Sequence, residues 1–255
     1  MSKRMYLILA VLCLSLLAPL LATAQQEEPS VFTYVGLWSV PRAQWDDFTA
    51  FRQKNAQPIL ERFFADGTIV GWGNFATIVH EEEGYTHGTW WSAASIAGIE
   101  RVLGELLKLP PNPAVTPTKH RDHLFRSLIH RSRPASGSGY LWVSAFQIQP
   151  GKGRDARELW DKYTKPTYDE LLANGTITMY VREREQVRTE NPALRYFVYI
   201  APSADGIDKV RAAFVALEQQ RGPVENRAIE TAFADVTVAG SSRNYFARIA
   251  NYAQK

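Results

Sequence analysis

Cysteine is almost absent from this chain of 255 residues, which contains a single one, Cys13. One cysteine excludes a disulfide framework and any metal site built from several thiolates. An excess of charge is missing too, because 29 basic residues face 26 acidic ones and leave a formal net charge of +3. Without an arginine-rich run, this balance argues against a nucleic-acid partner. The apolar fraction of 45% is that of an ordinary globular protein.

Long hydrophobic runs are also missing, except for one at the N-terminus. Lys3 and Arg4 precede an apolar run over residues 5–21, and the small-spacer-small sequence Ala22-Thr23-Ala24 follows it. This three-part pattern is typical of a secretory signal that is cleaved after residue 24. An uncleaved anchor helix is the alternative, although the run lies at the short end of a membrane span. We therefore expect an exported protein, periplasmic or extracellular, with no stable membrane anchor once the signal peptide is removed.

The remaining chain contains an internal repeat at an offset of 108 residues. Residues 58–69 align with residues 166–177, and both segments end in Gly-Thr-Ile. Further positions match in type at the same offset, among them Trp72 with Tyr180, Ser95 with Ser203 and Phe125 with Phe233. Chance would not keep one register without a gap through so many matches, so we interpret the chain as a tandem duplication.

Hydrophobic periodicity predicts the same order of elements in each copy, namely strand, helix, strand, strand, helix and strand. The predicted strands span residues 31–40, 68–80, 86–92 and 123–130 in the first copy, and 139–148, 176–187, 194–200 and 232–238 in the second. Pro58 and Pro166 should interrupt the first helices, and Ser95 and Ser203 suit the N-caps of the second. The predicted organisation is a signal peptide at 1–24, ferredoxin-like repeats at 25–130 and 139–255, and a linker at 131–138.

A ferredoxin-like βαββαβ unit covers one face of its sheet with helices and leaves the other face bare. The predicted fold class is therefore α+β, with two such repeats burying their bare faces as a pseudo-dimeric α/β barrel. In this order of elements the chain resembles the dimeric α/β-barrel superfamily. That superfamily includes antibiotic-biosynthesis-type monooxygenases, small lactone isomerases, stress-responsive barrels, and haem enzymes of the chlorite dismutase and dye-decolourising peroxidase groups. The resemblance implies the fold, and it matches no catalytic motif of the superfamily.

Strand alternation predicts which side chains share the cavity between the two sheets. We expect Thr33, Val35 and Leu37 to face the helices, and the aromatic residues of the opposite face to line the cavity. The expected ligand-binding residues are aromatic except for one arginine: Tyr34, Trp38, Trp72, Trp91, Trp142, Phe146, Tyr180, Arg182 and Tyr199. An aromatic cavity with few polar groups suits a small apolar or aromatic ligand. The same side chains would equally suit a fully packed core.

Histidine occurs five times, always in the first copy. His87 faces the predicted cavity and is the candidate general base, while Asn74 or Arg195 would stabilise developing negative charge. No metal site is predicted, because His120 and His123 adjoin a strand on which they would point to opposite faces. No cofactor is expected either, although the resemblance leaves haem bound by one first-copy histidine as an alternative.

Charge alternates in sign over residues 182–185, which puts two arginines on one face of a strand and two glutamates on the other. The arginines could bind an anion, although such a strand end is more often solvated.

Four functions remain open at this point. The first is binding of a small apolar or aromatic ligand in an inter-strand cavity. The second is a cofactor-independent monooxygenase- or isomerase-like enzyme, as the resemblance implies, and the third is haem binding. The fourth is an interaction module with a fully packed core. We expect a monomer that acts as a pseudo-dimer, although fusion of two copies does not forbid a homo-oligomer.

Overall fold

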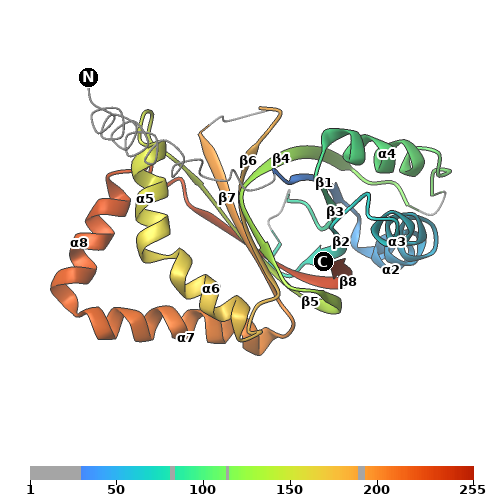
Figure 1. Ribbon diagram of the computed structural model, residues 1–255. Helices are drawn as coiled ribbons and strands as arrows, with labels where there is room; N and C mark the ends of the chain where they lie inside the picture. The colour runs from blue at the N-terminus through green and yellow to red at the C-terminus, as the bar shows by residue number, and fades with distance from the viewer. Residues whose placement is uncertain (1–29, 81–83, 113–114, 189–192) are drawn as a thin grey trace, which may run out of the picture.

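The computed structural model describes residues 30–80, 84–112, 115–188 and 193–255. The expected signal peptide lies outside these residues. Within them, eight antiparallel strands form one closed barrel in the order β1-β3-β2-β8-β5-β7-β6-β4, and β4 pairs with β1 to close it. Two groups of helices lie on opposite sides of the barrel (Figure 1). In the part of the chain that the structure describes, no helix is long and apolar enough to cross a membrane.

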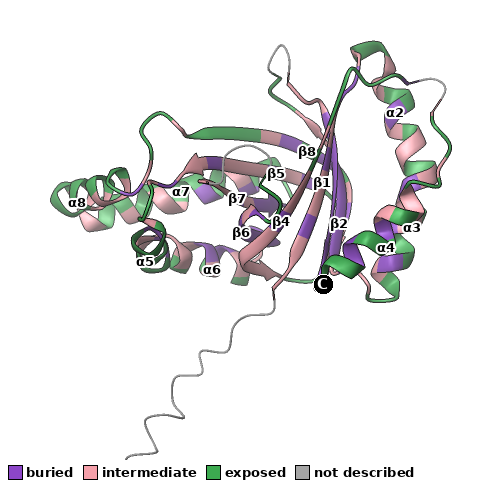
Figure 2. Ribbon diagram, turned by 90° about the horizontal axis from the view of Figure 1, so that it is seen from above, coloured by how far each residue is buried: buried purple, intermediate pink, exposed green. Residues whose placement is uncertain are grey.

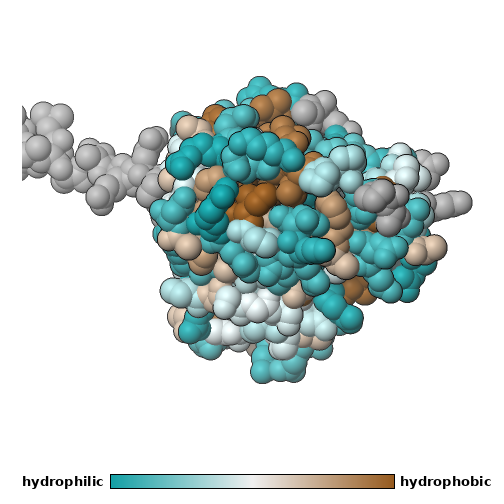
Figure 3. Space-filling view, turned by 90° about the vertical axis from the view of Figure 1, so that its right-hand side faces the viewer, coloured by the Kyte–Doolittle hydropathy of each residue, from teal (hydrophilic) through white to brown (hydrophobic). Residues whose placement is uncertain are grey.

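The first half of the chain contributes four strands and the helices on one side. The strands are β1 (Phe32–Ser39), β2 (Gly71–Thr77), β3 (His87–Ala93) and β4 (Lys119–Ser132). The helices are the short 3₁₀ turn η2 (Arg42–Gln44), α2 (Trp45–Phe51), the π-helical turn η3 (Arg52–Ala56), α3 (Gln57–Ala65) and α4 (Ile96–Leu106). Figure 3 shows that this side of the molecule is mainly hydrophilic, with hydrophobic side chains gathered near the centre of the view.

The second half contributes the other four strands and the helices on the opposite side. The strands are β5 (Ala135–Gln147), β6 (Met179–Glu185), β7 (Leu194–Ala201) and β8 (Arg243–Gln254). The helices are α5 (Gly153–Tyr163), α6 (Lys165–Ala173), α7 (Ala204–Arg221) and α8 (Pro223–Ala234).

Two local signals of the sequence determine where the helices begin. Pro58 and Pro166 lie in the first turns of α3 and α6, where a missing backbone N–H costs nothing. Ser95 and Ser203 cap α4 and α7. The hydroxyl oxygen of each serine accepts a hydrogen bond from the backbone N–H of the glycine three residues later, at 3.1 Å in α4 and 3.2 Å in α7. Such a cap contributes about 1 kcal/mol to helix stability. These boundaries confirm the predicted interruptions and caps.

The predicted last strand at residues 232–238 is wrong. Most of that segment belongs to the end of α8 and the turn after it, and the last strand is β8, beginning at Arg243. The pairing shows the shift: Thr33 pairs with Phe125, whereas Leu141, at the 108-residue offset from Thr33, pairs with Ala247. The second half therefore contains an additional helix, α8, before its last strand, and Phe233 is not the counterpart of Phe125. An alignment without gaps cannot reveal such an insertion.

The expected linker at residues 131–138 is mostly strand. β4 continues to Ser132, which pairs with Met179 of β6, and β5 begins at Ala135, which pairs with Gln254 of β8. Pro, Gly and Ser residues predict a loop locally, but these strands close the barrel between the two halves of the chain. Tertiary pairing therefore overrides the local preference.

Two hydrophobic layers hold the helices against the barrel. The layer under α3 and α4 includes Leu60, Phe63, Ile69, Trp72, Trp91, Ile99 and Val102. The layer under α5 to α7 includes Trp160, Tyr168, Leu171, Tyr180, Phe197, Tyr199 and Val210. Figure 2 shows the buried residues on the strands and on the helix sides that face them. Both layers use large aromatic side chains, which bury more area than aliphatic ones.

The predicted assignment of strand faces is reversed. Thr33, Val35 and Leu37 were expected under the helices, yet they line the interior of the barrel. Tyr34, on the opposite face of the same strand, stacks on Trp91 of the helix-covered layer with ring centroids 4.3 Å apart. Alternation separates the two faces of a strand correctly, but it does not say which of them the helices cover.

Candidate functional site

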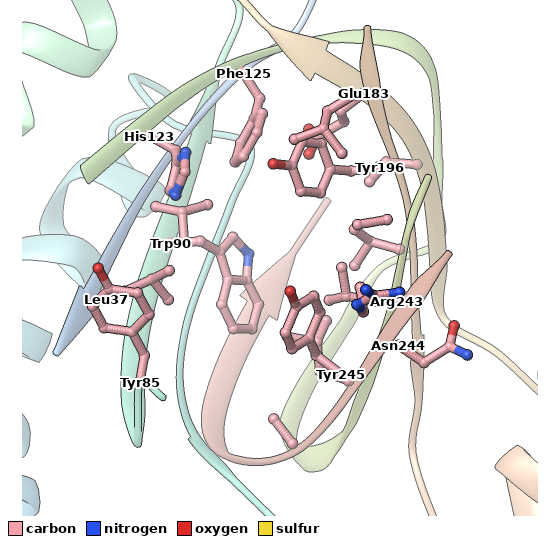
Figure 4. A pocket seen from close by; sticks show the side chains of 18 of the residues that line it. Leu37, Tyr85, Trp90, His123, Phe125, Glu183, Tyr196, Arg243, Asn244 and Tyr245 are labelled. Carbon is pink, nitrogen blue, oxygen red and sulfur yellow. The ribbon is translucent and has the colours of Figure 1, made fainter. Parts of the chain in front are cut away.

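The barrel encloses a cavity of about 790 Å³ that is lined by residues of all eight strands. Its middle is apolar and includes Val35, Trp90, Leu141, Val143, Val181, Val198 and Ala247. Polar side chains gather where β1 and β5 end and where β4 and β8 begin, among them Arg121, His123, Gln147, Arg243 and Asn244. Figure 4 labels three of them, His123, Arg243 and Asn244. The cavity thus combines an apolar wall with one polar end, which is typical of a small-molecule site.

Glu183 is the acidic side chain in the wall of this cavity and is only 3% exposed. Its Oε1 accepts a hydrogen bond from Thr33 Oγ1 at 2.8 Å and another from Ser127 Oγ at 3.2 Å. Burial raises the pKa of the Glu183 carboxyl to about 7, although the two hydroxyl donors act in the opposite direction. A carboxyl that ionises near neutral pH can accept or donate a proton under physiological conditions.

Aromatic side chains lie next to this carboxyl. Tyr196 of β7 is the cross-strand partner of Glu183, and both point into the cavity (Figure 4). The Phe125 ring lies 4.8 Å from the Tyr196 ring, centroid to centroid. A ligand at this position would contact the Glu183 carboxyl and the aromatic rings of Tyr196 and Phe125.

Sequence reasoning did not select Glu183, although the pattern contained the signal. The alternation over residues 182–185 correctly put the two glutamates on one face, and both are buried. The segment was expected to be a solvated strand end, because charged strands usually are. Its burial depends on β4 and β7, which pair with the two edges of β6, and β4 is far from β6 in the sequence.

The predicted site residues lie on the outer face of the barrel, in two separate groups. The first group lies on the strands beside α2 to α4 and comprises Tyr34, Trp38, Trp72, Asn74, His87 and Trp91. The second lies on the strands beside α5 to α8 and comprises Trp142, Phe146, Tyr180, Arg182, Arg195 and Tyr199. Among the described residues that line the barrel cavity, none belongs to either group. Arg195 is therefore not brought together with His87 and Asn74.

His87 is buried on the outer face of β3 under α2. Its Nδ1 lies 2.9 Å from Thr86 Oγ1, and the rings of Trp45 and Phe48 pack against it with centroids at 5.2 and 5.0 Å. Burial lowers the pKa of His87 to about 4, and the nearby His80 acts in the same direction. The imidazole is therefore neutral at pH 7.

We expect an NMR titration of the His87 ring to give a midpoint near pH 4. Because the pKa of His87 is about 4 in the folded state and about 6.5 in the unfolded chain, its neutral form favours folding. This contribution is complete above pH 6.5 and is lost as the pH falls towards 4. A midpoint close to 6.5 would contradict the burial of this ring.

Gly73 of β2 allows Trp90 to lie flat against the inner wall. A Cβ at Gly73 would stand 2.0 Å from Cη2 of Trp90, so the indole cannot keep its position beside any larger residue. We expect Gly73→Ala to displace Trp90, shift the tryptophan fluorescence and lower the free energy of unfolding by about 1–3 kcal/mol. Gly104→Ala is the control, because no atom lies within 4 Å of its added Cβ in helix α4. Equal effects of both substitutions would contradict this packing.

The comparisons with known proteins concern the fold. No family model matches this sequence, and no curated protein matches it either. A crystal structure of a proposed monooxygenase from Fusobacterium nucleatum is similar, with a TM-score of 0.59 at 8% identity over 89% of this chain and 94% of that one. Another, from Lactobacillus acidophilus, has a TM-score of 0.57 at 9% identity over 89% and 97%. At such identities the likeness concerns architecture and not activity. This likeness supports the observed architecture, an eight-stranded antiparallel barrel between two groups of helices, which agrees with the barrel that the resemblance to the dimeric α/β-barrel superfamily predicts.

Proposed function

We propose that this protein binds a small, mainly apolar ligand inside the barrel, with a polar group of the ligand against Glu183. The supporting observation is the cavity of about 790 Å³, whose middle is apolar around one buried carboxyl. This volume lies within the usual range of ligand sites. Because the carboxyl has a pKa of about 7, it can donate to or accept from a hydroxyl or amine of the ligand.

The test is the binding of the neutral fluorescent probe N-phenyl-1-naphthylamine. Val198 lines the cavity, so Val198→Phe should fill part of it and weaken probe binding roughly tenfold or more. Val215→Phe makes the same change on α7, where the side chain is 42% exposed, and should leave the affinity unchanged. Native mass spectrometry of the purified protein then shows whether a natural ligand is retained.

Two results would contradict this proposal. One is a folded wild-type protein that neither retains a ligand nor binds the probe. The other is equal binding by both valine variants, which would place the probe outside the barrel. His87→Ala and Arg195→Ala should leave probe binding unchanged, because neither residue lines the cavity.

A cofactor-independent enzyme of the oxygenase or isomerase kind is the second candidate. Glu183 supports it, because a buried carboxyl with a pKa of about 7 is suited to removing a proton from an acidic C–H or O–H group of a bound substrate. Tyr196, on the facing strand, would lie beside the same substrate. The earlier catalytic candidates His87, Asn74 and Arg195 stay predictions, and they would act in the helix-covered layers rather than in the barrel.

Haem binding through a first-copy histidine stays a third proposal. Trp45 and Phe48 pack against the His87 ring, so an iron atom would reach this imidazole only after α2 moved. Titration with haem tests the proposal, because an axial histidine gives a Soret band that is lost in the corresponding alanine variant. A band that survives His87→Ala would exclude His87 as the ligand.

We also propose that the chain is a monomeric tandem duplication and that it is exported. Strands from the two halves pair in matching orders, β4-β1-β3-β2 and β8-β5-β7-β6, which supports two ferredoxin-like repeats in a monomeric pseudo-dimer.

The pattern of residues 1–24 supports export to the periplasm or beyond. Intact-mass measurement after expression of the full chain tests the export, because cleavage would remove these residues. Sedimentation of the product tests whether it is a monomer.

A further inference from the structure

A second cavity, of about 320 Å³, lies outside the barrel on the side of the second half. It is bordered by α5, β5, β6 and residues 238–242, which lead into β8. Its wall is mostly apolar and includes Phe146, Ile148, Ala156, Trp160, Phe233 and Val236. This composition suits the body of a small organic molecule.

Arg182 is the charged side chain of this cavity. It is 4% exposed, and its Nε has no hydrogen-bond partner within the part of the chain that the structure describes. The Arg182 guanidinium lies 5.5 Å from the ring centroid of Trp160, whose Nε1 is likewise unpartnered among the described residues. The buried Nε–H of Arg182 and the buried Nε1–H of Trp160, both without hydrogen-bond acceptors among the described residues, cost free energy unless a ligand supplies the acceptors.

The charges around Arg182 favour an anion as that ligand. Burial lowers the pKa of Arg182 to about 10, so the guanidinium is still charged at pH 7. Asp161 raises this pKa, whereas Arg157 and Arg195 lower it because they add positive charge nearby. Asp161 and Arg157 are both exposed on α5, where solvent screens them. The partly buried Arg195 then leaves the neighbourhood of Arg182 with an excess of positive charge.

The two strand positions of the first half that correspond to Arg182 and Arg195 carry no charge. Asn74 pairs with Thr89 on β3 as Arg182 pairs with Phe197 on β7. His87, which pairs with Trp38, occupies the place that Arg195 has opposite Phe146. Since His87 is neutral at pH 7, two uncharged residues in the first half correspond to two arginines in the second.

We propose that the cavity around Arg182 binds the carboxylate of a small, mainly apolar organic acid. Arg182 would pair with the carboxylate, and the Trp160 indole N–H would supply a further donor. Phe146 and Phe233 would contact the apolar body. This site shares residues 238–241 with the lining of the barrel cavity, but Arg182 and Trp160 line only the second cavity, and the proposal does not depend on the function proposed for the barrel.

Isothermal titration calorimetry with benzoate and its uncharged analogue benzamide tests the proposal. Wild-type protein should bind benzoate, and it should bind benzamide roughly tenfold more weakly or not at all, because a charge-assisted pair is lost. Arg182→Gln should lose benzoate binding to a similar degree. Arg211→Gln is the matched control, because it removes the same charge from the exposed surface of α7 and should bind benzoate normally.

A further pair of variants keeps the test sharp if Arg182→Gln fails to fold. Arg182→Lys retains the charge without the planar guanidinium, and Trp160→Phe retains a ring without the N–H donor, so both should bind benzoate more weakly than wild type. Near-ultraviolet circular dichroism shows whether each variant is folded. Absence of benzoate binding to wild type, equal binding of benzamide, or unchanged affinity in the folded Arg182 variants would each overturn the proposal.

Discussion

The wild-type protein should lose about 3 kcal/mol of its free energy of unfolding as the pH rises from 4.5 through 7, and Glu183→Gln should abolish this loss. Burial in the barrel wall raises the pKa of this carboxyl to about 7 from an ordinary value of 4.5. The folded protein therefore binds the proton more tightly than the unfolded chain does. The stabilisation by the protonated carboxyl is complete below pH 4.5 and is lost as the pH rises through 7.

Glutamine keeps the oxygen that accepts from Thr33 and Ser127, but it cannot ionise. The variant and the wild type should therefore unfold at similar denaturant concentrations at pH 4, and the variant should be the more stable one at pH 8. Glu230→Gln, an exposed change on α8, serves as the control and should leave the pH profile as it is. Denaturant unfolding at several pH values gives the measurement. Parallel profiles for Glu183→Gln and wild type would contradict the raised pKa.

The same variant separates the two candidate functions of the barrel. If Glu183 acts as a proton acceptor, the substitution should abolish turnover of any substrate that is found, while binding of that substrate persists. If Glu183 only hydrogen-bonds a ligand, the substitution should change affinity and its pH dependence. Comparison of binding and turnover in Glu183→Gln therefore distinguishes a binding protein from an enzyme.

Trp91→Ala should lower the free energy of unfolding by about 3–5 kcal/mol, as for other large aromatic residues in cores. Trp91 is 1% exposed, lies against Tyr34, and belongs to the layer that holds α3 and α4 on the barrel. Denaturant unfolding measures the loss. Binding of the neutral probe by the protein that remains folded should be unaffected, because Trp91 faces away from the cavity.

Trp90→Ala is the matched comparison, one residue away on the opposite face of the strand. Trp90 borders the cavity, so part of its ring has no protein neighbour to lose, and its removal should cost less stability than that of Trp91. It should also change probe affinity and fluorescence. The reverse outcome, in which Trp91→Ala abolishes probe binding and Trp90→Ala does not, would return the ligand to the helix-covered face.

The order of elements follows from local features that the sequence states directly. Ser95 and Ser203 supply a capping oxygen, and Pro58 and Pro166 remove an amide that only a first helical turn can spare. These effects act within a few residues of chain and need no tertiary partner. They were therefore predictable, as was the α+β class. The additional helix α8 was not, because a repeat aligned without gaps hides an insertion.

By itself, the sequence determined that two groups of side chains alternate along each strand, and that Tyr34 and Trp91 share one of those groups. Only the tertiary structure decided which group faces the inside of the barrel. Helix packing buries one face, barrel closure buries the other, and both bury apolar side chains, so hydrophobicity cannot tell them apart. The same holds for Glu183. Its position on a strand can be read from alternation. Its burial, which raises its pKa, and its hydrogen bonds with Thr33 and Ser127 arise only because the closed barrel brings other strands around it.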